Sequence, residues 1–367
     1  MGLSEMWSAG RFLPVVAIAV ATVCAVAILG TAGSSLGYDY AAYVQAGQRI
    51  LDGRPLYDPA VDVAGGFAIY LYPPPFALAL VPFALLPAAV GPWPWIALLI
   101  VAFLAGVALL PVPAAVRWLV LLLGGMDWPV LFALKLGQVG PLLFLAFALA
   151  WRWLDRPVPF GAAAAAGTIV KLQPALLLGW AALTGRRRAF LVGLGVVVAA
   201  ALVATVVLGP GVWADYVALL RRVSAPVATP HNFTPGAIAY QLGAGEAAAT
   251  AIQMTAAVAT IVVILAAIRF ASAEASLLAT IVGSQLLSPL LWDHYAIVLL
   301  LPTAYLLARG HFWAAAIPLL TSLPLIGLTP SAVYPLAFGL CLVALVVVGW
   351  RRAGGTNGLA TAFQWLR

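Results

Sequence analysis

The chain has 367 residues, of which 65% are hydrophobic and 8% are charged. An average soluble domain is roughly 45–50% apolar and about 25% charged, so the composition excludes a soluble globular protein. With so few charges, lipid must cover most of the surface, and the sequence predicts a polytopic membrane protein. The formal net charge of +7 is explained first by basic residues that anchor cytoplasmic loops, which argues against nucleic acid as a partner. The only two cysteines, Cys24 and Cys341, lie inside apolar runs, which argues against a disulfide framework and a cysteine-based metal site.

The hydrophobic segments predict an all-α integral membrane protein with about ten full spans plus short broken helices. A full span must cross about 30 Å of hydrocarbon. The runs that are long enough are residues 12–30, 72–88, 93–111, 138–151, 188–208, 248–268, 275–291, 295–308, 312–328 and 331–350. Two further stretches, 113–134 and 160–184, are broken by Gly, Pro and one lysine each, and each is predicted to form two half-helices.

The arginines predict the orientation of these spans. The first apolar run, of about 19 residues, exceeds the 7–15 residues of a signal-peptide core, so we expect a retained first helix. With Arg11 and the N-terminus in the cytoplasm, nine further arginines fall on the cytoplasmic side, among them the cluster at 186–188: Arg152, Arg156, Arg186, Arg187, Arg188, Arg269, Arg309, Arg351 and Arg352. The expected protein is a single transmembrane domain, residues 1–367, in the plasma membrane with both termini cytoplasmic. Most acidic residues then face outward, and the outer loops 31–71 and 209–247 are expected to contribute to an outward-facing active site.

Asp39 lies where the first span is expected to meet a helix on the membrane surface. Aromatic and apolar residues recur at helical spacing after it, among them Tyr40, Tyr43 and Val44. Two interpretations of Asp39 are open. Its carboxylate could cap the N-terminus of the surface helix. Alternatively, a carboxylate near its reference pKa of about 3.9 is ionised at neutral pH and is available as a general base.

The chain has only two lysines, Lys135 and Lys171, and each interrupts an apolar stretch. A charged group costs about 2.5–3.5 kcal/mol at the centre of an inserted helix, so an aqueous cavity or an anionic partner such as a phosphate is expected beside each lysine. Gln138 and Gln173 follow the two lysines closely, and a helix-breaking proline follows each glutamine. The alternative is a lysine that snorkels to the membrane surface.

The segment SPLLWDHY, residues 288–295, places Asp293 and His294 at an outer membrane boundary. A turn in an aromatic belt explains the neighbouring Trp and Tyr but leaves the Asp and His without a role. His294 could donate to a phosphate oxygen or orient an acceptor sugar. No Glu or second His stands at ligand spacing, so the sequence predicts no metal site and no cofactor. His231 and Asn232, in the second outer loop, are candidates of lower rank.

Several motifs occur in a fixed order along the chain: D-Y-x-x-Y-x-x-A-G at 39–47, LYD at 56–58, YPPP at 72–75, GQ at 137–138, K-x-x-P at 171–174 and SPLLWDHY at 288–295. This ordered set resembles glycosyltransferase family 87, a group of GT-C-class integral membrane enzymes that use polyprenyl-phosphate-linked sugars, typically mannose. The resemblance runs over nearly the whole chain. It implies a GT-C-type fold with Asp39 in the catalytic-base position, and an inverting, metal-independent transfer on the outer face.

The residues fit the chemistry that this resemblance implies. A lipid phosphate is already a leaving group, so the site needs a base for the acceptor hydroxyl and positive donors for the phosphate charge that develops. Asp39 is expected to be the base. The side chains expected to bind the donor phosphate are Lys171, Lys135, His294 and Arg49. Those expected to contact the substrates are Tyr43, Tyr72, Gln138, Gln173, Asp293, His231 and Asn232.

The expected partners are a polyprenyl-phosphate-sugar donor, a lipid or glycan acceptor and membrane lipids. Two other functions remain open: a flippase or transporter of lipid-linked sugars without transferase activity, and a non-catalytic membrane scaffold. A transporter should carry charged residues midway along several spans and inverted repeats, whereas the polar groups of this chain gather at one face. A scaffold gives no reason for two buried lysines.

Overall fold

The computed structural model describes residues 3–58, 69–224, 231–328 and 331–350. Parts of the two expected outer loops, at 59–68 and 225–230, and the C-terminal residues 351–367 lie outside these ranges. Within the described ranges every regular element is a helix, apart from one isolated bridge between Ala271 and Trp350. The prediction of an all-α membrane protein is confirmed.

The helices follow one another along the chain with short connections. The α-helices of the described ranges are α1 (Leu3–Gly30), α2 (Tyr38–Leu51), α3 (Pro74–Ala84), α4 (Pro92–Leu109), α5 (Ala114–Gly125), α6 (Trp128–Leu136), α7 (Gly140–Arg152), α8 (Pro157–Val170), α9 (Ala175–Leu183), α10 (Arg187–Leu208), α11 (Gly211–Val223), α12 (Pro235–Gln241), α13 (Glu246–Phe270), α14 (Ala273–Leu286), α15 (Leu300–Leu307), α16 (Ala316–Thr321) and α17 (Val333–Gly349). The 3-10 helices are η1 (Gly33–Ser35), η2 (Asp293–Leu299), η3 (Phe312–Ala315) and η4 (Leu323–Ile326).

The number of helices that can span a membrane is smaller than the sequence predicts. Among the described residues, four helical segments are long and apolar enough: Phe12–Gly30, Pro92–Leu109, Arg187–Leu208 and Glu246–Phe270. The pair α5 and α6, bent by 61° at its break, could form a fifth span. The count of ten full spans is therefore not confirmed. The run 138–151 is too short for a full span although it is almost entirely helical, because α7 has 13 residues and covers only about 20 Å at 1.5 Å per residue.

The two broken stretches form two helices each, as the sequence predicts. The first stretch breaks between α5 and α6, and the second breaks between α8 and α9. At the second break Lys171 has an extended backbone, with φ −154° and ψ 148°. Pro174 has no backbone N–H and disfavours a helical conformation in the residue before it, so the helix cannot continue through this point.

Three breaks between helices carry polar residues that meet inside the protein. Gln138 lies between α6 and α7, Lys171 and Gln173 lie between α8 and α9, and Ser288 lies between α14 and η2. Nε2 of Gln173 donates to Oγ of Ser288 over 3.1 Å, so the second and third breaks are in contact. Gln138 and Lys171 line one pocket, so the first break joins them. Short helices that end within the protein therefore bring their polar ends together.

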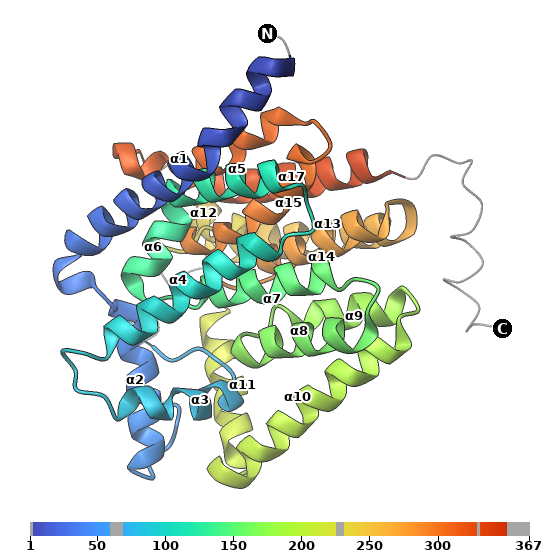
Figure 1. The fold of residues 1–367 in the computed structure, drawn as a ribbon. Coiled ribbons are helices and arrows are strands. Elements are labelled where there is room, and N and C mark those ends of the chain that lie inside the picture. Colours follow the sequence, from blue (N-terminus) through green and yellow to red (C-terminus); the bar gives the residue numbers. More distant parts are fainter. Residues whose placement is uncertain (1–2, 59–68, 225–230, 329–330, 351–367) are drawn as a thin grey trace.

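Helices α2 and α11 run across the direction of α7 and α8 (Figure 1). One face of α2 is buried and packs on α3. Its other residues are mostly exposed or half-buried, as expected for an amphipathic helix. The start of α2 is joined to α6, because the backbone N–H of Gly37 donates to the carbonyl of Lys135 over 2.8 Å.

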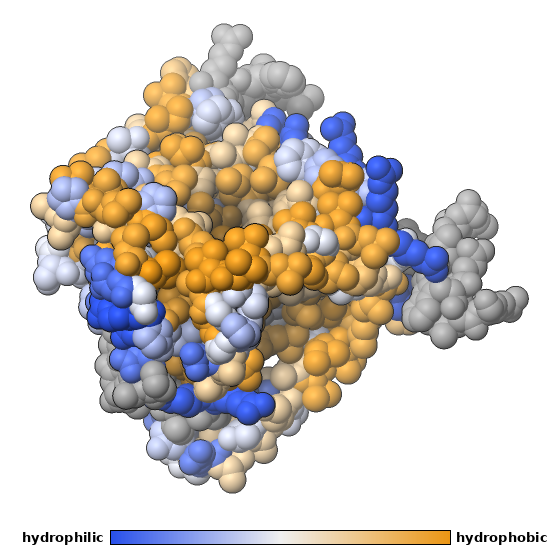
Figure 2. Space-filling model, turned by 90° about the horizontal axis from the view of Figure 1, so that it is seen from below, coloured by the Kyte–Doolittle hydropathy of each residue, from blue (hydrophilic) through white to orange (hydrophobic). Residues whose placement is uncertain are grey.

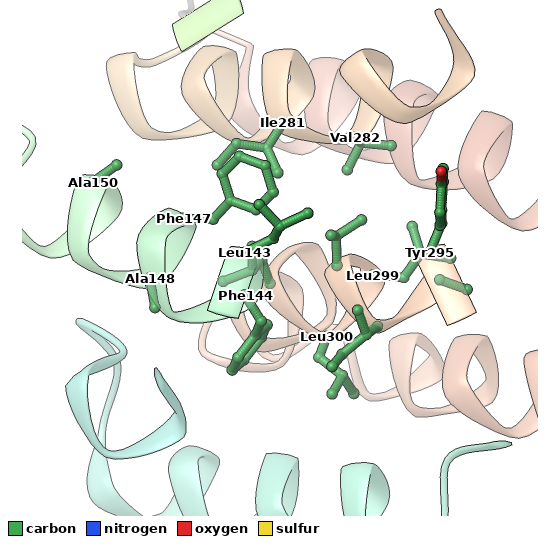
Figure 3. Packing of buried hydrophobic residues seen from close by; sticks show 14 of the residues in the cluster. Leu143, Phe144, Phe147, Ala148, Ala150, Ile281, Val282, Tyr295, Leu299 and Leu300 are labelled. Carbon is green, nitrogen blue, oxygen red and sulfur yellow. The ribbon is translucent and has the colours of Figure 1, made fainter. Parts of the chain in front are cut away.

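The core lies between the short helices. Phe147 of α7 lies beside Ile281 of α14, whereas Phe144 points to the opposite side of α7 (Figure 3), where its ring centroid lies 5.6 Å from that of Phe103 in α4. By contrast, large apolar side chains on the long helix α10 are exposed; Val206, for example, is 85% exposed. Apolar residues also cover much of the surface seen from below, where hydrophilic residues form separate groups (Figure 2). Such exposure is typical of a surface that faces lipid.

Candidate functional site

Asp39 lies in the first turn of α2, close to the break that carries Gln138. The N-cap of α2 is Gly37, which adopts φ 67°, and no side chain caps the helix. The capping interpretation of Asp39 is therefore wrong. Instead, Oδ2 of Asp39 accepts a hydrogen bond from Nε2 of Gln138 over 2.6 Å. The carboxylate thus faces a polar group from a distant part of the chain.

The surroundings of Asp39 change its acidity. Burial raises the pKa of the Asp39 carboxyl above its ordinary value, and the nearby His294, the hydrogen bond from Gln138 and the Lys171 ammonium oppose that increase. A carboxylate with a raised pKa is a stronger base than one in water. The group is therefore suited to accept a proton from a bound hydroxyl.

Gln138 is held on both sides of its side-chain amide. The hydroxyls of Tyr72 and Tyr43 lie 2.9 Å and 3.2 Å from its Oε1, and the Tyr43 hydroxyl also donates to that of Tyr72 over 2.8 Å. Tyr43 is fully buried, so in this structure it reaches the site only through Tyr72 and Gln138. Tyr72 lies closer to the site, with its ring centroid 5.6 Å from Nζ of Lys171.

Lys171 lies just after the last residue of α8 and is half-buried. Its Nζ donates to the hydroxyl of Tyr295 and lies 3.7 Å from the centroid of the Tyr295 ring. These contacts are with neutral aromatic groups, which attract a cation but do not neutralise it. Burial lowers the pKa of Lys171 to about 7 and the Asp39 carboxylate opposes that decrease, so a bound anion would favour the charged ammonium.

Several buried polar atoms near Tyr295 lack a hydrogen-bond partner among the described residues. They are both ring nitrogens of His294, Nε1 of Trp292 and Oε1 of Gln173. The Trp292 ring centroid lies 5.5 Å from that of His294 and 5.9 Å from that of Tyr295, so these residues are neighbours. Each unsatisfied buried polar group costs about 1–3 kcal/mol. Buried polar groups without a partner in the protein are commonly satisfied by bound water, ions or ligands, so this cluster can hydrogen-bond a polar ligand.

A small pocket lies among these groups. Its polar lining comes from Gln138, Lys171, Gln285, His294 and Tyr295. A ligand in this pocket would have the amide that contacts Asp39 on one side and the ammonium of Lys171 on another. The pocket therefore combines access to a base with a positive charge and a histidine that can donate hydrogen bonds.

Two residues expected to bind phosphate lie away from this pocket lining. Arg49 donates through Nη1 to the carbonyl of Pro55 over 2.9 Å and through Nη2 to Oδ2 of Asp58 over 3.1 Å. These two hydrogen bonds hold the loop that follows α2. Arg49 is also ten residues after Asp39, about 15 Å away along the α2 axis. Lys135 is half-buried in the last turn of α6 and is not among the residues that line the pocket.

Asp293 is engaged at the start of η2. Its Oδ2 accepts from Nε1 of Trp128 over 2.9 Å, and its Oδ1 accepts from the backbone N–H of His294 over 2.9 Å. Nδ1 of His294 lies 3.6 Å from Oδ1 of Asp293. The structure therefore gives Asp293 the contacts of a residue that positions His294.

Asn232 is fully buried and bonded to the backbone. Its Nδ2 donates to the carbonyl of Pro289 over 2.9 Å, and its Oδ1 accepts from the N–H groups of Thr234 and Leu291 over 3.1 Å and 3.0 Å. It ties the segment before α12 to the segment before η2. The neighbouring His231 is exposed and does not line the pocket.

Sequence reasoning missed three residues of the site. From the sequence, Trp292 and Tyr295 are explained as residues of an aromatic belt. In the structure, Tyr295 contacts Lys171 and Trp292 lies beside His294. Gln285 is buried inside the apolar helix α14. A glutamine within an apolar run is the sequence feature that could have identified it as a site residue. In the parts of the chain that the structure describes, no three His, Cys, Asp or Glu side chains are grouped as metal ligands.

No curated protein and no solved structure matches the chain. The sequence profile of glycosyltransferase family 87 matches residues 70–292, well over half of the chain. The matched region contains the breaks that carry Gln138 and Lys171, whereas Asp39 lies well before its first residue and His294 lies two residues after its last. The chain is therefore a membrane glycosyltransferase that belongs to glycosyltransferase family 87.

Proposed function

We propose that this glycosyltransferase moves a sugar, with mannose as the expected sugar, from a polyprenyl-phosphate donor to a hydroxyl of a lipid or glycan acceptor. One observation carries the proposal: Lys171 and Gln138 line one small pocket, and Gln138 donates to Asp39, so a cation and a base from distant segments lie on either side of it. The pocket is also lined by His294, whose ring nitrogens have no hydrogen-bond partner among the described residues. Transfer from a sugar phosphate needs a base for the acceptor hydroxyl and a cation for the leaving phosphate oxygen.

The proposed reaction is a single displacement. The acceptor hydroxyl oxygen attacks the anomeric carbon as Asp39 takes the hydroxyl proton, and a new glycosidic C–O bond forms. The bond from the anomeric carbon to the phosphate oxygen breaks, and its electron pair leaves with the polyprenyl phosphate. Lys171 and His294 stabilise the charge that develops on that phosphate. Attack from the face opposite the phosphate inverts the anomeric centre.

We place this reaction on the outer face of the plasma membrane and without a metal ion. The orientation rests on the arginines between spans. Lys171, with help from His294, would take the role that a divalent cation plays in other phosphate sites. Tyr72, Gln173 and Trp292 stand close enough to Lys171 and His294 to contact the donor.

A purified-protein assay tests the proposal. The protein in lipid nanodiscs is given polyprenyl-phosphate-mannose and a panel of phosphoinositide, glycan and lipid acceptors, with and without a chelator. We expect release of polyprenyl phosphate that depends on an acceptor and is unaffected by the chelator. Movement of the donor across proteoliposome membranes without release of polyprenyl phosphate would instead favour the transporter.

A further inference from the structure

We propose that Gln138 is a positioning residue for Asp39: its side-chain amide, held in one orientation by the hydroxyls of Tyr72 and Tyr43, keeps an N–H directed at the carboxylate. This inference rests on the proposed role of Asp39 as the base. It differs from the sequence-based expectation, in which Gln138 contacts the substrate.

The orientation of the amide follows from the hydrogen-bond partners on its two sides. An ionised carboxylate only accepts hydrogen bonds, so the group of Gln138 that faces Asp39 over 2.6 Å must be the NH₂. The oxygen then faces Tyr72, 2.9 Å away. The hydroxyls form a chain in which Tyr43 donates to Tyr72 and Tyr72 donates to Oε1 of Gln138. A flipped amide would place its oxygen against the carboxylate and leave the Tyr72 proton without that acceptor.

The backbone of Gln138 is held as firmly as its amide. α6 ends with Gly137 at φ 74°, and the N–H groups of Gly137 and Gln138 return to the carbonyls of Leu134 and Ala133 over 3.2 Å and 2.8 Å. This pattern is a Schellman motif, which fixes the direction in which the chain leaves the helix. In addition, Nε1 of Trp95 donates to the carbonyl of Gly137 over 2.6 Å.

The consequence is a lower pKa for Asp39 than its burial alone would give. The hydrogen bond from Gln138 favours the charged carboxylate and so lowers the pKa that burial raises. The titratable groups that face Asp39 are His294 and Asp293 on η2, Lys171 after α8, and the tyrosines Tyr43, Tyr72 and Tyr295. Gln138 is neutral, so replacing it with another neutral residue changes none of these charges.

The experiment compares Gln138→Met and Gln138→Glu with the wild-type enzyme. Met removes the N–H donor at similar length, and Glu replaces it with a second carboxyl. For each protein, kcat and KM for transfer from polyprenyl-phosphate-mannose are measured across the acidic and neutral pH range. We expect the acidic limb of kcat to move to higher pH by about one pH unit in Gln138→Met and further in Gln138→Glu, with KM changed little. The matched control is Gln45→Met, an exposed position on α2, which should leave the limb in place.

Two outcomes would overturn the inference. One is an acidic limb that stays in place in both Gln138 variants, and the other is a rise in KM at every pH, which would make Gln138 a substrate contact. If neither variant folds, Tyr72→Phe provides the test. This substitution removes one of the two hydroxyls that hold the Gln138 amide. The acidic limb of kcat should move to higher pH, but by less than in Gln138→Met, because the Tyr43 hydroxyl still lies 3.2 Å from Oε1.

A second readout separates this inference from the proposed function. The protonated Asp39 carboxyl is followed by infrared titration of the purified protein without substrates, with its band assigned by Asp39→Asn. A wild-type protein without transfer activity would refute the proposed function. The infrared titration would still decide whether Gln138 controls Asp39, because an unmoved Asp39 band in Gln138→Met contradicts the positioning role whatever the activity.

Discussion

The backbone hydrogen bond from Gly37 to Lys135, 2.8 Å long, joins the start of α2 to the end of α6. Asp39 follows Gly37 by two residues, and Gln138 follows Lys135 by three. The distance between the carboxylate and the amide is therefore set by a short backbone frame and does not depend on long side chains. Frames of this kind hold reactive groups within the narrow limits that catalysis requires.

Asp39→Asn should stop transfer while donor binding persists. Asn keeps the size of the side chain and an oxygen for Gln138, but it cannot accept the hydroxyl proton, so we expect kcat to fall by at least about 100-fold. Donor affinity should change by less than about threefold, because a base contributes little to holding a phosphate. Turnover and donor binding are measured on the same purified variant. Near-normal transfer would remove Asp39 from the mechanism.

The same substitution should change how stability depends on pH. The pKa of Asp39 is raised by burial, so between its ordinary value of about 3.9 and the raised value the folded protein binds more protons than the unfolded chain. Stability should therefore fall as pH rises through this window and then level off. We expect the difference in melting temperature between Asp39→Asn and the wild type to grow in favour of the variant over that window. A difference that is independent of pH would contradict the burial of the charge.

Lys171→Gln should weaken donor binding as well as transfer. A hydrogen bond to a charged group contributes about 1.5–3 kcal/mol, so donor affinity should fall roughly 10- to 100-fold. The empty protein should be at least as stable, because no buried ammonium remains. Arg54→Gln is the control, since Arg54 is an exposed cation paired with Asp52. Donor affinity that is equal in the Lys171 variant and the wild type would refute the phosphate assignment.

Arg49→Gln should leave the transfer rate within about twofold of the wild type. The guanidinium holds Pro55 and Asp58 and is distant from the pocket, and a partly exposed ion pair contributes about 0–1 kcal/mol. We expect a small decrease in melting temperature and unchanged donor affinity. Loss of donor affinity in this variant would show that the loop after α2 moves Arg49 into the site during the reaction.

Cysteine labelling should place the arginine cluster and Asp39 on opposite sides of the membrane. Cys24→Ala and Cys341→Ala provide a background without native thiols. In this background a cysteine introduced by Arg187→Cys should react only after the cells are permeabilised, and one introduced by Arg54→Cys should react in intact cells. Both positions are exposed, so access of the reagent is comparable. Labelling of position 187 from outside would reverse the orientation and move the proposed site to the cytoplasmic face.

The sequence by itself determined the class of the protein and the places where its helices break. An apolar content of 65% requires a membrane environment. Pro174 lacks a backbone N–H and disfavours a helical conformation in the residue before it, so a break near Lys171 is favoured by local backbone chemistry, and α9 begins directly after this proline. The candidates Asp39, Lys171 and His294 could also be selected because ionisable groups in an apolar chain need a specific reason.

Only the tertiary structure decided which of these candidates belong together. Asp39 and Gln138 are 99 residues apart, and their hydrogen bond depends on how α2 packs against the end of α6. The sequence could not show whether Arg49 binds a phosphate or pairs with a carboxylate of the protein. The structure shows that it pairs with Asp58. The number of full spans also depended on packing, because an apolar run has the same composition whether a long helix exposes it to lipid or short helices bury it against one another. Hydropathy reports the transfer of a residue out of water, and it carries no information on whether lipid or protein receives it.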